Sequence, residues 1–198
     1  TVFCGIGCRE AKSEVLRLAQ KLGSPIAHTL RAMDVFDYRD GPVVGLTGNI
    51  GNPAGFHAVN DCDVLLMLGT DFPYTEFLPD GRPIIQVDTR VDHIGRRAPV
   101  TLGLVGDAGA TVRALLPMLD DHQRSTEFRD LLLGIRDKWL AHSNKQSSLG
   151  RRDEPLHPQI FAKAISDAAA DDAIFAVDVG ECTCLLYTSD AADDLLCV

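Results

Sequence analysis

The sequence predicts a doubly wound α/β domain on a parallel sheet of about six strands, followed by an incomplete second α/β unit. Apolar runs of strand length alternate with segments whose apolar residues recur at helical spacing. Two of the runs, residues 63–70 and 83–89, are almost continuously apolar, as in strands that helices cover on both faces. Strands and helices that alternate in this way form a parallel sheet, and ligands lie beyond the carboxyl ends of its strands.

The individual elements follow from local patterns. The chain starts on a strand at residues 2–4, so we expect it to be cut upstream; residues 9–22 then share an apolar helical face and end at Gly23. Three strands, including the two apolar runs, are expected in the middle of the sheet, and Asp107 is expected to cap the helix after them. The further strands are expected at 25–29, 43–46, 63–70, 83–89 and 100–107, and the further helices at 54–60, 107–119 and 127–142.

A polar, helix-poor segment divides the chain. Residues 143–156 are expected to be a linker between a first domain at 1–142 and the start of a second at 157–183. In this second unit a helix is expected at 157–169 and a strand at 173–178. The last stretch, 184–198 (CLLYTSDAADDLLCV), resembles a translated sequencing-adapter tail and is left out of the fold prediction.

Composition narrows the class of partner. The formal net charge of −9 argues against nucleic acid, because phosphate binding needs clustered lysine and arginine. No run approaches the roughly 18 apolar residues of a membrane span, and the first residues lack the pattern of a signal peptide, so a cytoplasmic protein is expected. The six cysteines have no metal-binding spacing and are expected to be buried or incidental thiols.

The first strand-to-helix loop contains two glycines. Gly5 and Gly7 are compatible with a dinucleotide-binding turn, but the third glycine of the classical fingerprint is replaced by Glu10. The second strand ends at residues 29–31, Thr-Leu-Arg, where that fingerprint would have an acidic residue. The loop is therefore either a purely structural turn or one wall of a different nucleotide site.

Other loops at the same sheet edge suit a nucleotide better. Residues 47–51 offer backbone N–H groups leading into a helix, residues 69–73 end a central strand, and Asp88 could accept hydrogen bonds from ribose hydroxyls. Together they predict one long groove for an extended dinucleotide. Each has a plainer alternative: Asp88 as a turn cap and Arg31 as a solvated surface charge. No nucleophile–base pair is evident, and His57 is expected to be a packed core histidine.

The combination of TGNIG (47–51), GTDFPY (69–74) and QVD (86–88) resembles the thiamine diphosphate-dependent 2-keto acid enzymes. Within that family the chain is most similar to the flavin-containing pyruvate oxidases, or pyruvate dehydrogenases (quinone), over residues 1–183. The resemblance implies that residues 1–142 are the FAD-binding central domain and residues 157–183 the start of the thiamine diphosphate-binding domain. The residues implied to contact FAD are Gly5, Gly7, Arg31, Thr47, Gly48, Asn49, Ile50, Gly69, Thr70, Asp71, Phe72, Pro73 and Asp88.

The resemblance also implies an activity for the complete protein. Pyruvate would be oxidatively decarboxylated to acetate and CO2 with thiamine diphosphate and Mg²⁺, and electrons would pass through FAD to quinone or oxygen. The family's catalytic and metal-binding residues lie outside this chain, so the fragment alone is expected to be inactive. A homotetramer is implied for the complete enzyme, cytoplasmic and, in some members, peripheral at the inner face of the membrane.

Two alternatives remain open from the sequence. The first is an acetolactate synthase-like or other thiamine-dependent decarboxylase or carboligase, in which FAD is structural. The second, from a different class, is a stand-alone nucleotide-binding module with an NAD-type ligand.

Overall fold

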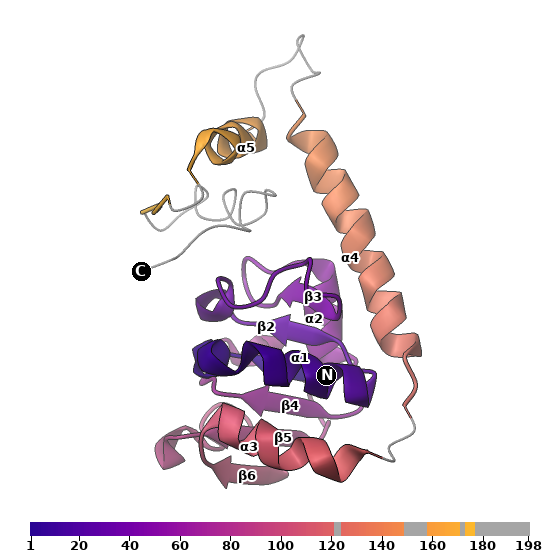
Figure 1. Ribbon diagram of the computed structural model, residues 1–198, viewed down its shortest axis with the longest axis vertical. Helices are drawn as coiled ribbons and strands as arrows, with labels where there is room; N and C mark the ends of the chain where they lie inside the picture. The colour runs from indigo at the N-terminus through magenta and orange to yellow at the C-terminus, as the bar shows by residue number, and fades with distance from the viewer. Residues whose placement is uncertain (121–123, 149–157, 171–172, 177–198) are drawn as a thin grey trace.

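Six parallel strands form one sheet in the order β3-β2-β1-β4-β5-β6 (Figure 1). The computed structural model describes residues 1–120, 124–148, 158–170 and 173–176. The strands are β1 (Val2–Cys4), β2 (Ile26–His28), β3 (Val43–Leu46), β4 (Leu65–Leu68), β5 (Ile84–Asp88) and β6 (Leu102–Val105). This is the order of the doubly wound dinucleotide-binding folds, so the predicted fold class is confirmed.

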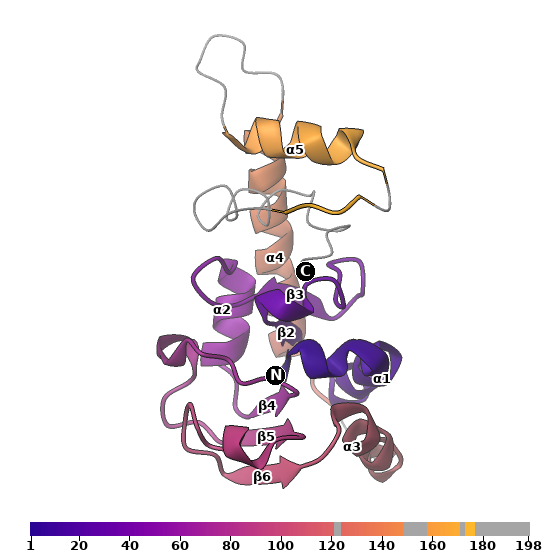
Figure 2. The ribbon, with the colours of Figure 1, turned by 90° about the vertical axis from the view of Figure 1, so that its left-hand side faces the viewer.

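Helices cover both faces of the sheet. In Figure 2, α1 and α3 lie on one side of the strands and α2 on the other, where it also contacts α4. The helices are α1 (Lys12–Leu22), α2 (Pro53–Asn60), α3 (Ala108–Leu115), α4 (Glu127–Gln146) and α5 (Pro158–Ala168). Short 3₁₀ helices are η1 (Ile6–Ala11), η2 (Leu30–Ala32), η3 (Thr75–Phe77), η4 (Val91–His93) and η5 (Leu116–Leu119).

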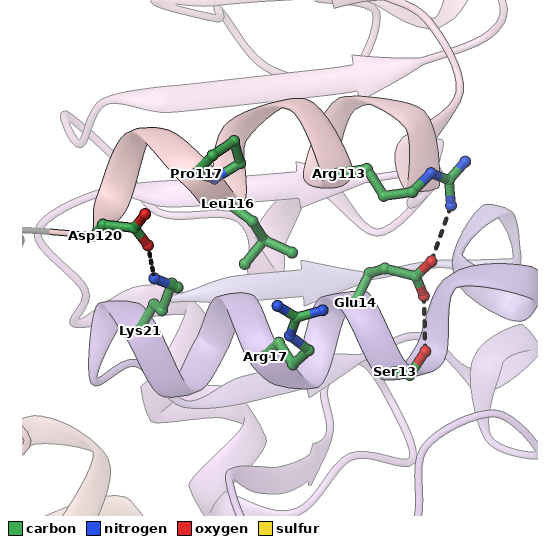
Figure 3. Close-up of a pocket in the computed structure, with 8 residues that line it drawn as sticks. All are labelled: Ser13, Glu14, Arg17, Lys21, Arg113, Leu116, Pro117 and Asp120. Carbon is green, nitrogen blue, oxygen red and sulfur yellow. Dashed lines mark hydrogen bonds and ion pairs between the residues drawn. The ribbon is translucent and has the colours of Figure 1, made fainter.

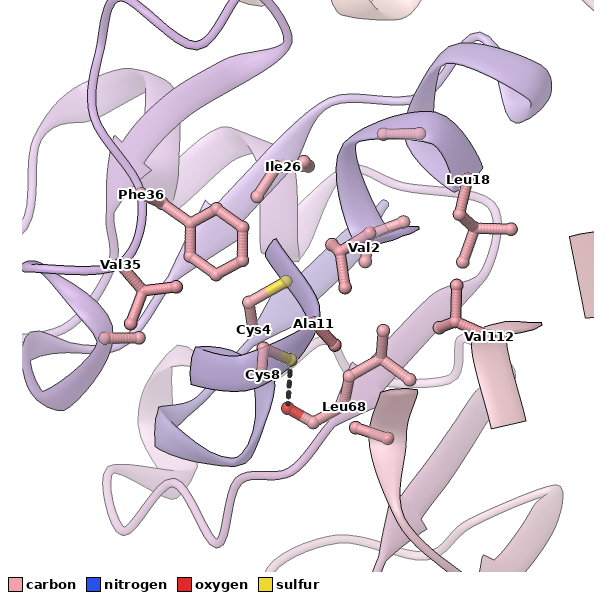
Figure 4. Close-up of a cluster of buried hydrophobic side chains, with 14 of the residues drawn as sticks. Val2, Cys4, Cys8, Ala11, Leu18, Ile26, Val35, Phe36, Leu68 and Val112 are labelled. Atoms are coloured by element: carbon pink, nitrogen blue, oxygen red, sulfur yellow. Dashed lines mark hydrogen bonds between the residues drawn. The ribbon is translucent and has the colours of Figure 1, made fainter. Parts of the chain in front are cut away.

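Each face has its own apolar core. Under α1 and α3, Cys4 and Cys8 pack with Leu18 and Leu68, and the thiol of Cys8 donates to the carbonyl of Leu68 at 3.4 Å (Figure 4). Under α2 and α4, Leu132 of α4 is fully buried in the cluster that contains strand residues of β1 to β5. The alternating pattern of the sequence is therefore satisfied by a three-layer α/β/α arrangement.

Side chains and glycines define the helix ends. Gly23 ends α1 as predicted, with a φ of 65°, a left-handed conformation that glycine adopts without a Cβ penalty. Asn52 caps α2 by accepting from the N–H of Gly55 at 2.7 Å, and the predicted cap Asp107 accepts from Ala110 at 2.8 Å. Arg136 of α4 donates to the carbonyl of Val43 at 2.7 Å and so ties that helix to β3.

Two expectations about the domain are wrong in detail. Residues 100–107 were expected in the middle of the sheet, but β6 is the edge strand and all four of its residues are exposed. An apolar run does not reveal whether a strand has neighbours on both sides, and this one is short and interrupted by Gly103. The first residues of the helix expected at 9–22 belong instead to the 3₁₀ helix η1. The N–H groups of Gly5 and Gly7 at its start donate to the carbonyls of Leu68 and Gly69, which ties this segment to the loop after β4.

The second unit departs further from the prediction. Helix α4 continues to Gln146, so the first residues of the segment expected to be a linker are helical. The helix expected at 157–169 corresponds to α5, but residues 173–176 are not in a strand, since they pair with no described strand. Residues 149–156 of the predicted linker, residues 177–178 of the predicted strand and residues 184–198 lie outside the described residues. Among the described helices, none is long and apolar enough to cross a bilayer.

Candidate functional site

A cleft of about 990 Å³ runs along the carboxyl edge of the sheet. The loops that follow all six strands contribute to its walls, from residues 29–31 after β2 to residues 106–108 after β6. The volume is at the upper end of the range, roughly 300–1,000 Å³, that small-molecule sites occupy. Because the carboxyl ends of parallel strands meet at one edge, the topology collects these loops into one site.

Twelve of the thirteen residues predicted to bind a cofactor line this cleft. They are Gly7, Arg31, Thr47, Gly48, Asn49, Ile50, Gly69, Thr70, Asp71, Phe72, Pro73 and Asp88. Gly5 is buried below the cleft and is not among its lining residues. The structure thus brings the predicted residues together, and their roles toward a ligand stay a prediction.

The glycines of the first loop are required by contact between two loops. A Cβ on Gly5 would lie 2.5 Å from Cβ of Thr70, and a Cβ on Gly7 would lie 2.8 Å from Cα of Gly69. The N–H of Gly7 donates to the carbonyl of Gly69 at 3.1 Å. Close packing of the loops after β1 and β4 accounts for both glycines without any ligand, and of the two only Gly7 also lines the cleft.

The loop after β3 presents an unpartnered hydroxyl to the cleft. Thr47 is 2% exposed, and its Oγ1 atom has no hydrogen-bond partner in the structure. The following residue, Gly48, has a φ of 112°, which favours glycine. Asn52 holds the base of this loop by donating its side-chain amide to the carbonyl of Val44 at 3.2 Å. A buried polar atom without a partner is costly, so Thr47 fits a site that a polar ligand completes.

Asp88 at the end of β5 retains hydrogen-bonding capacity. The residue is 7% exposed, and Oδ1 accepts from the N–H of Arg90 at 2.9 Å, so the turn-capping interpretation is confirmed. Oδ2 lies 3.2 Å from Nδ1 of His93, without a hydrogen bond between them. A carboxylate has about four lone-pair sites, so the turn cap leaves acceptors for ribose hydroxyls.

Asp71 differs from the other predicted residues because arginines occupy its carboxylate. Arg97 donates to both oxygens at 3.1 Å each, and Arg96 also pairs with them. The Asp71 side chain is 13% exposed. Its evident role is to join the loop after β4 to the loop after β5. Arg31, in contrast, is exposed and has no ion-pair partner within the described residues, so it can meet a phosphate at the β2 end of the cleft.

Sequence reasoning missed ten lining residues. Asp107 was expected to be a helix cap in preference to a ligand, and in the loop after β5, which contains His93, no residue beyond Asp88 was predicted. The topology rule alone would have pointed to the loop after β6, and Tyr74 is the last residue of the motif GTDFPY that carried the resemblance. The missed residues are Ile6, Thr29, Leu30, Tyr74, Thr89, Arg90, His93, Gly106, Asp107 and Ala108.

A buried histidine lies immediately below the cleft. His28 is 2% exposed, and its Nδ1 lies 3.1 Å from the carbonyl oxygen of Thr29, so the neutral ring carries its proton on Nδ1. Burial lowers the pKa of His28 from 6.5 to about 4, because the apolar surroundings disfavour the charged ring. The folded chain therefore holds this histidine neutral at pH values where the unfolded chain protonates it.

Acidification is expected to destabilise the fold through His28. The unfolded state binds the additional proton below its pKa of 6.5, so stability is fully present above that value and is lost as the pH falls toward 4. Between about pH 7 and pH 5 the loss is about 2 kcal/mol of unfolding free energy. Urea denaturation of wild type and His28→Leu at both pH values tests this. Equal pH slopes for the two proteins would contradict it.

A second hollow, of about 440 Å³, lies between α1 and the α3–η5 segment (Figure 3). Glu14 of α1 pairs with Arg113 of α3 at 3.0 Å, and Lys21 pairs with Asp120. Figure 3 shows Arg17 between these two pairs. The hollow lies on the outer side of the helices, contains no predicted site residue, and has most of its charges already compensated.

Other candidate side chains have structural roles. His57 is not the core histidine that was expected: its side chain is 45% exposed and Nδ1 lies 2.8 Å from the Asp61 carboxylate, because the helix face it occupies turns to solvent. Cys4, Cys8 and Cys62 are buried free thiols, as predicted; the other cysteines lie outside the described residues. Burial raises the pKa of the Cys4 thiol. In the described part of the chain, no three His, Cys, Asp or Glu side chains gather as a metal site.

Comparison with known proteins gives a consistent family. Residues 1–115 match the model of the thiamine pyrophosphate enzyme central domain. A protein named as thiamine pyrophosphate-containing, YdaP of Bacillus subtilis, is 36% identical over 92% of this chain and 31% of its own length. Pyruvate oxidase of Lactiplantibacillus plantarum is 24% identical over 91% of this chain and 30% of its own length. An uncharacterized 42.6 kDa protein of Pseudomonas amyloderamosa is 48% identical over 60% of this chain and 30% of its own length.

The chain therefore spans about a third or less of the length of these relatives. The matched region, residues 1–115, contains all six strands and every residue that lines the cleft. Sheet order, cleft and family match agree, and the chain belongs to the thiamine pyrophosphate enzymes, of which it contains the central domain.

Proposed function

We propose that the cleft binds FAD and that the complete protein is a flavin- and thiamine diphosphate-dependent oxidoreductase that decarboxylates pyruvate. The observation that carries the FAD assignment is the position of the carboxylate. In classical NAD-binding folds the acidic residue for the adenosine ribose ends β2, but here β2 ends at His28 and is followed by Thr29, Leu30 and Arg31. Asp88 ends β5 instead, on the other side of the central strands. This arrangement favours an extended dinucleotide with its ribose at the β5 end.

The remaining lining residues fit the parts of such a ligand. Thr47 offers an unpartnered hydroxyl. Gly48 and Gly69 have positive φ and no side chain, so a ligand can approach their backbone closely. Arg31 provides the cation for the pyrophosphate. Phe72 and Tyr74, whose ring centroids lie 5.4 Å apart, form an aromatic wall for the apolar ring system. Bound FAD would supply a two-electron acceptor, and the chain's own residues bind and orient it.

Binding of FAD to the 198-residue chain tests the site directly. We expect FAD to bind at least tenfold more tightly than NAD⁺, and Asp88→Asn to weaken FAD binding by about tenfold or more, since a hydrogen bond to a charged group contributes roughly 1.5–3 kcal/mol. Asp61→Asn is the matched control, because Asp61 is exposed and pairs with His57, and neither residue lines the cleft. Isothermal titration measures all four affinities. Preference for NAD⁺ would favour the nucleotide-binding module.

A second experiment separates the oxidase from the carboligases. Relatives named probable acetolactate synthase large subunit and sulfoacetaldehyde acetyltransferase match the chain at 29% and 28% identity. The competing function is therefore that of a thiamine-dependent carboligase, in which FAD would be structural. In the complete protein with thiamine diphosphate and Mg²⁺, anaerobic pyruvate should bleach the visible flavin absorbance, and an added quinone should restore it. A flavin that stays oxidised while pyruvate is consumed would favour the carboligase. The homotetramer, the acceptor and membrane docking are parts of the proposal that rest on the resemblance.

A further inference from the structure

Gln86 is a buried polar residue of β5 that contacts the cleft loops without lining the cleft. It is 3% exposed and stands between the neighbouring strands β4 and β6. Its Nε2 donates to the carbonyl of Thr70 at 3.3 Å and to that of His93 at 3.2 Å. Its Oε1 accepts from the N–H of Gly95 at 2.9 Å. Both N–H groups and the carbonyl of the amide are therefore used.

The chemistry of these partners fixes the orientation of the amide. Two of the partners are carbonyl oxygens, which only accept, and the third is an N–H, which only donates. A flipped amide would place oxygen against oxygen and NH₂ against N–H, so only one orientation satisfies all three groups. Glutamate or methionine at this position could not reproduce this set of bonds.

The three backbone partners belong to the two loops that form one end of the cleft. Thr70 is in the loop after β4, His93 and Gly95 are in the loop after β5, and both Thr70 and His93 line the cleft. The His93 ring is in turn 3.2 Å from the Asp88 carboxylate. One side chain beneath the cleft thus sets the relative position of two loops that face the same ligand.

Ion pairs of Asp71 also join the same two loops, but they are a weaker support. Asp71 pairs with Arg96 and Arg97, whose side chains are 41% and 33% exposed, so solvent screens these ion pairs. Ile94 packs over Gly103 of β6, so that contact joins the loop after β5 to the edge strand and does not reach the loop after β4. Among the residues that the structure describes, Gln86 is the side chain whose hydrogen bonds reach backbone groups of both loops, and leaving such buried groups without partners carries the full desolvation cost.

We propose that Gln86 is a positioning residue of the nucleotide site, which holds the Thr70 and His93 backbones at the spacing that the bound cofactor requires. The proposal rests on FAD as the ligand of the cleft. It assigns to Gln86 no contact with the cofactor and no part in the chemistry. Its effect passes through the two loops, so it predicts a loss of loop order together with a loss of affinity.

The test uses the full 198-residue chain with Gln86→Met, which keeps the size of the side chain and removes all three hydrogen bonds. Amide hydrogen exchange without ligand should be faster in residues 70–74 and 91–97 than in wild type, and FAD affinity should fall about tenfold or more. Ile84→Val, a buried change at the first residue of the same strand, should change neither. Unchanged exchange in both loops, or unchanged FAD affinity, overturns the proposal.

Gln86→Glu provides a second readout that a merely structural role would not produce. Ionised glutamate is acceptor-only and would face two carbonyl oxygens, whereas protonated glutamate regains one donor. FAD affinity of this variant should therefore rise relative to wild type as the pH is lowered from about 8 to 6, since burial raises the pKa of a carboxyl group. A pH profile of FAD affinity that runs parallel to that of wild type overturns the proposal. This readout does not depend on Gln86→Met, so it still decides the question if that variant fails to fold. If wild type binds no FAD, the proposed function fails, and hydrogen exchange alone decides whether Gln86 positions the loops.

Discussion

Replacing Gly69 with alanine is expected to destabilise the chain by about 2–5 kcal/mol. Two costs add at this position. The residue has a φ of 58°, where an L side chain costs roughly 1–2 kcal/mol. In addition, its Cβ would lie 2.6 Å from Cα of Gly7, so two backbones would have to separate, at about 1–3 kcal/mol for overpacking. Urea denaturation followed by circular dichroism measures the difference in unfolding free energy.

Gly41→Ala is the matched control for this prediction. Gly41 has a φ of 63°, nearly that of Gly69, but nothing lies within 4 Å of its Cβ position. It should cost only the conformational part, about 1–2 kcal/mol. The difference between the two variants isolates the contact between the loops after β1 and β4. Equal destabilisation would show that the close approach of Gly7 and Gly69 does not limit this position.

Leu132→Ala is expected to cost about 3.5 kcal/mol of unfolding free energy, the middle of the range for a buried leucine. Leu132 is fully buried and fills the core between α4 and the strands under α2. Truncation leaves a cavity that the rigid sheet can only partly close, so the lost packing adds to the lost hydrophobic transfer. The same denaturation experiment measures the effect.

The neighbouring residue offers a control on the same helix. Leu131 is 62% exposed, and Leu131→Ala removes a side chain of the same size without creating a cavity. It should change stability by less than about 0.5 kcal/mol. A comparable loss for both variants would mean that the cost of Leu132→Ala does not come from its burial in the core, which would contradict the prediction.

Much of the site was predictable from local sequence because of one property of parallel sheets. Each apolar run indicates a strand, and the residues directly after it must lie at the same edge as those after every other strand. Thr47, Gly69 and Asp88 were placed by this argument, and all three line the cleft. The rule holds for any order of the strands in the sheet, so local sequence is enough to apply it.

What the rule could not supply is the partner of each side chain. Asp71 was predicted to face a ligand, but arginines 25 and 26 residues further along the chain occupy its carboxylate. Gln86 appeared only as part of a motif, and its role depends on loops that precede and follow its strand. Such pairings join residues that the fold, not the local pattern, brings together.

The sequence by itself determined the alternation of strands and helices, the helix ends at Gly23 and Asp107, and the edge at which a ligand would lie. These features depend on side-chain periodicity and on backbone conformations that a few neighbouring residues control. Only the tertiary structure decided that β6 is an exposed edge strand, and that Gly5 and Gly7 serve contact with the loop that contains Gly69. The physical reason is that close packing and hydrogen bonding act between residues far apart in sequence, after the sheet has assembled.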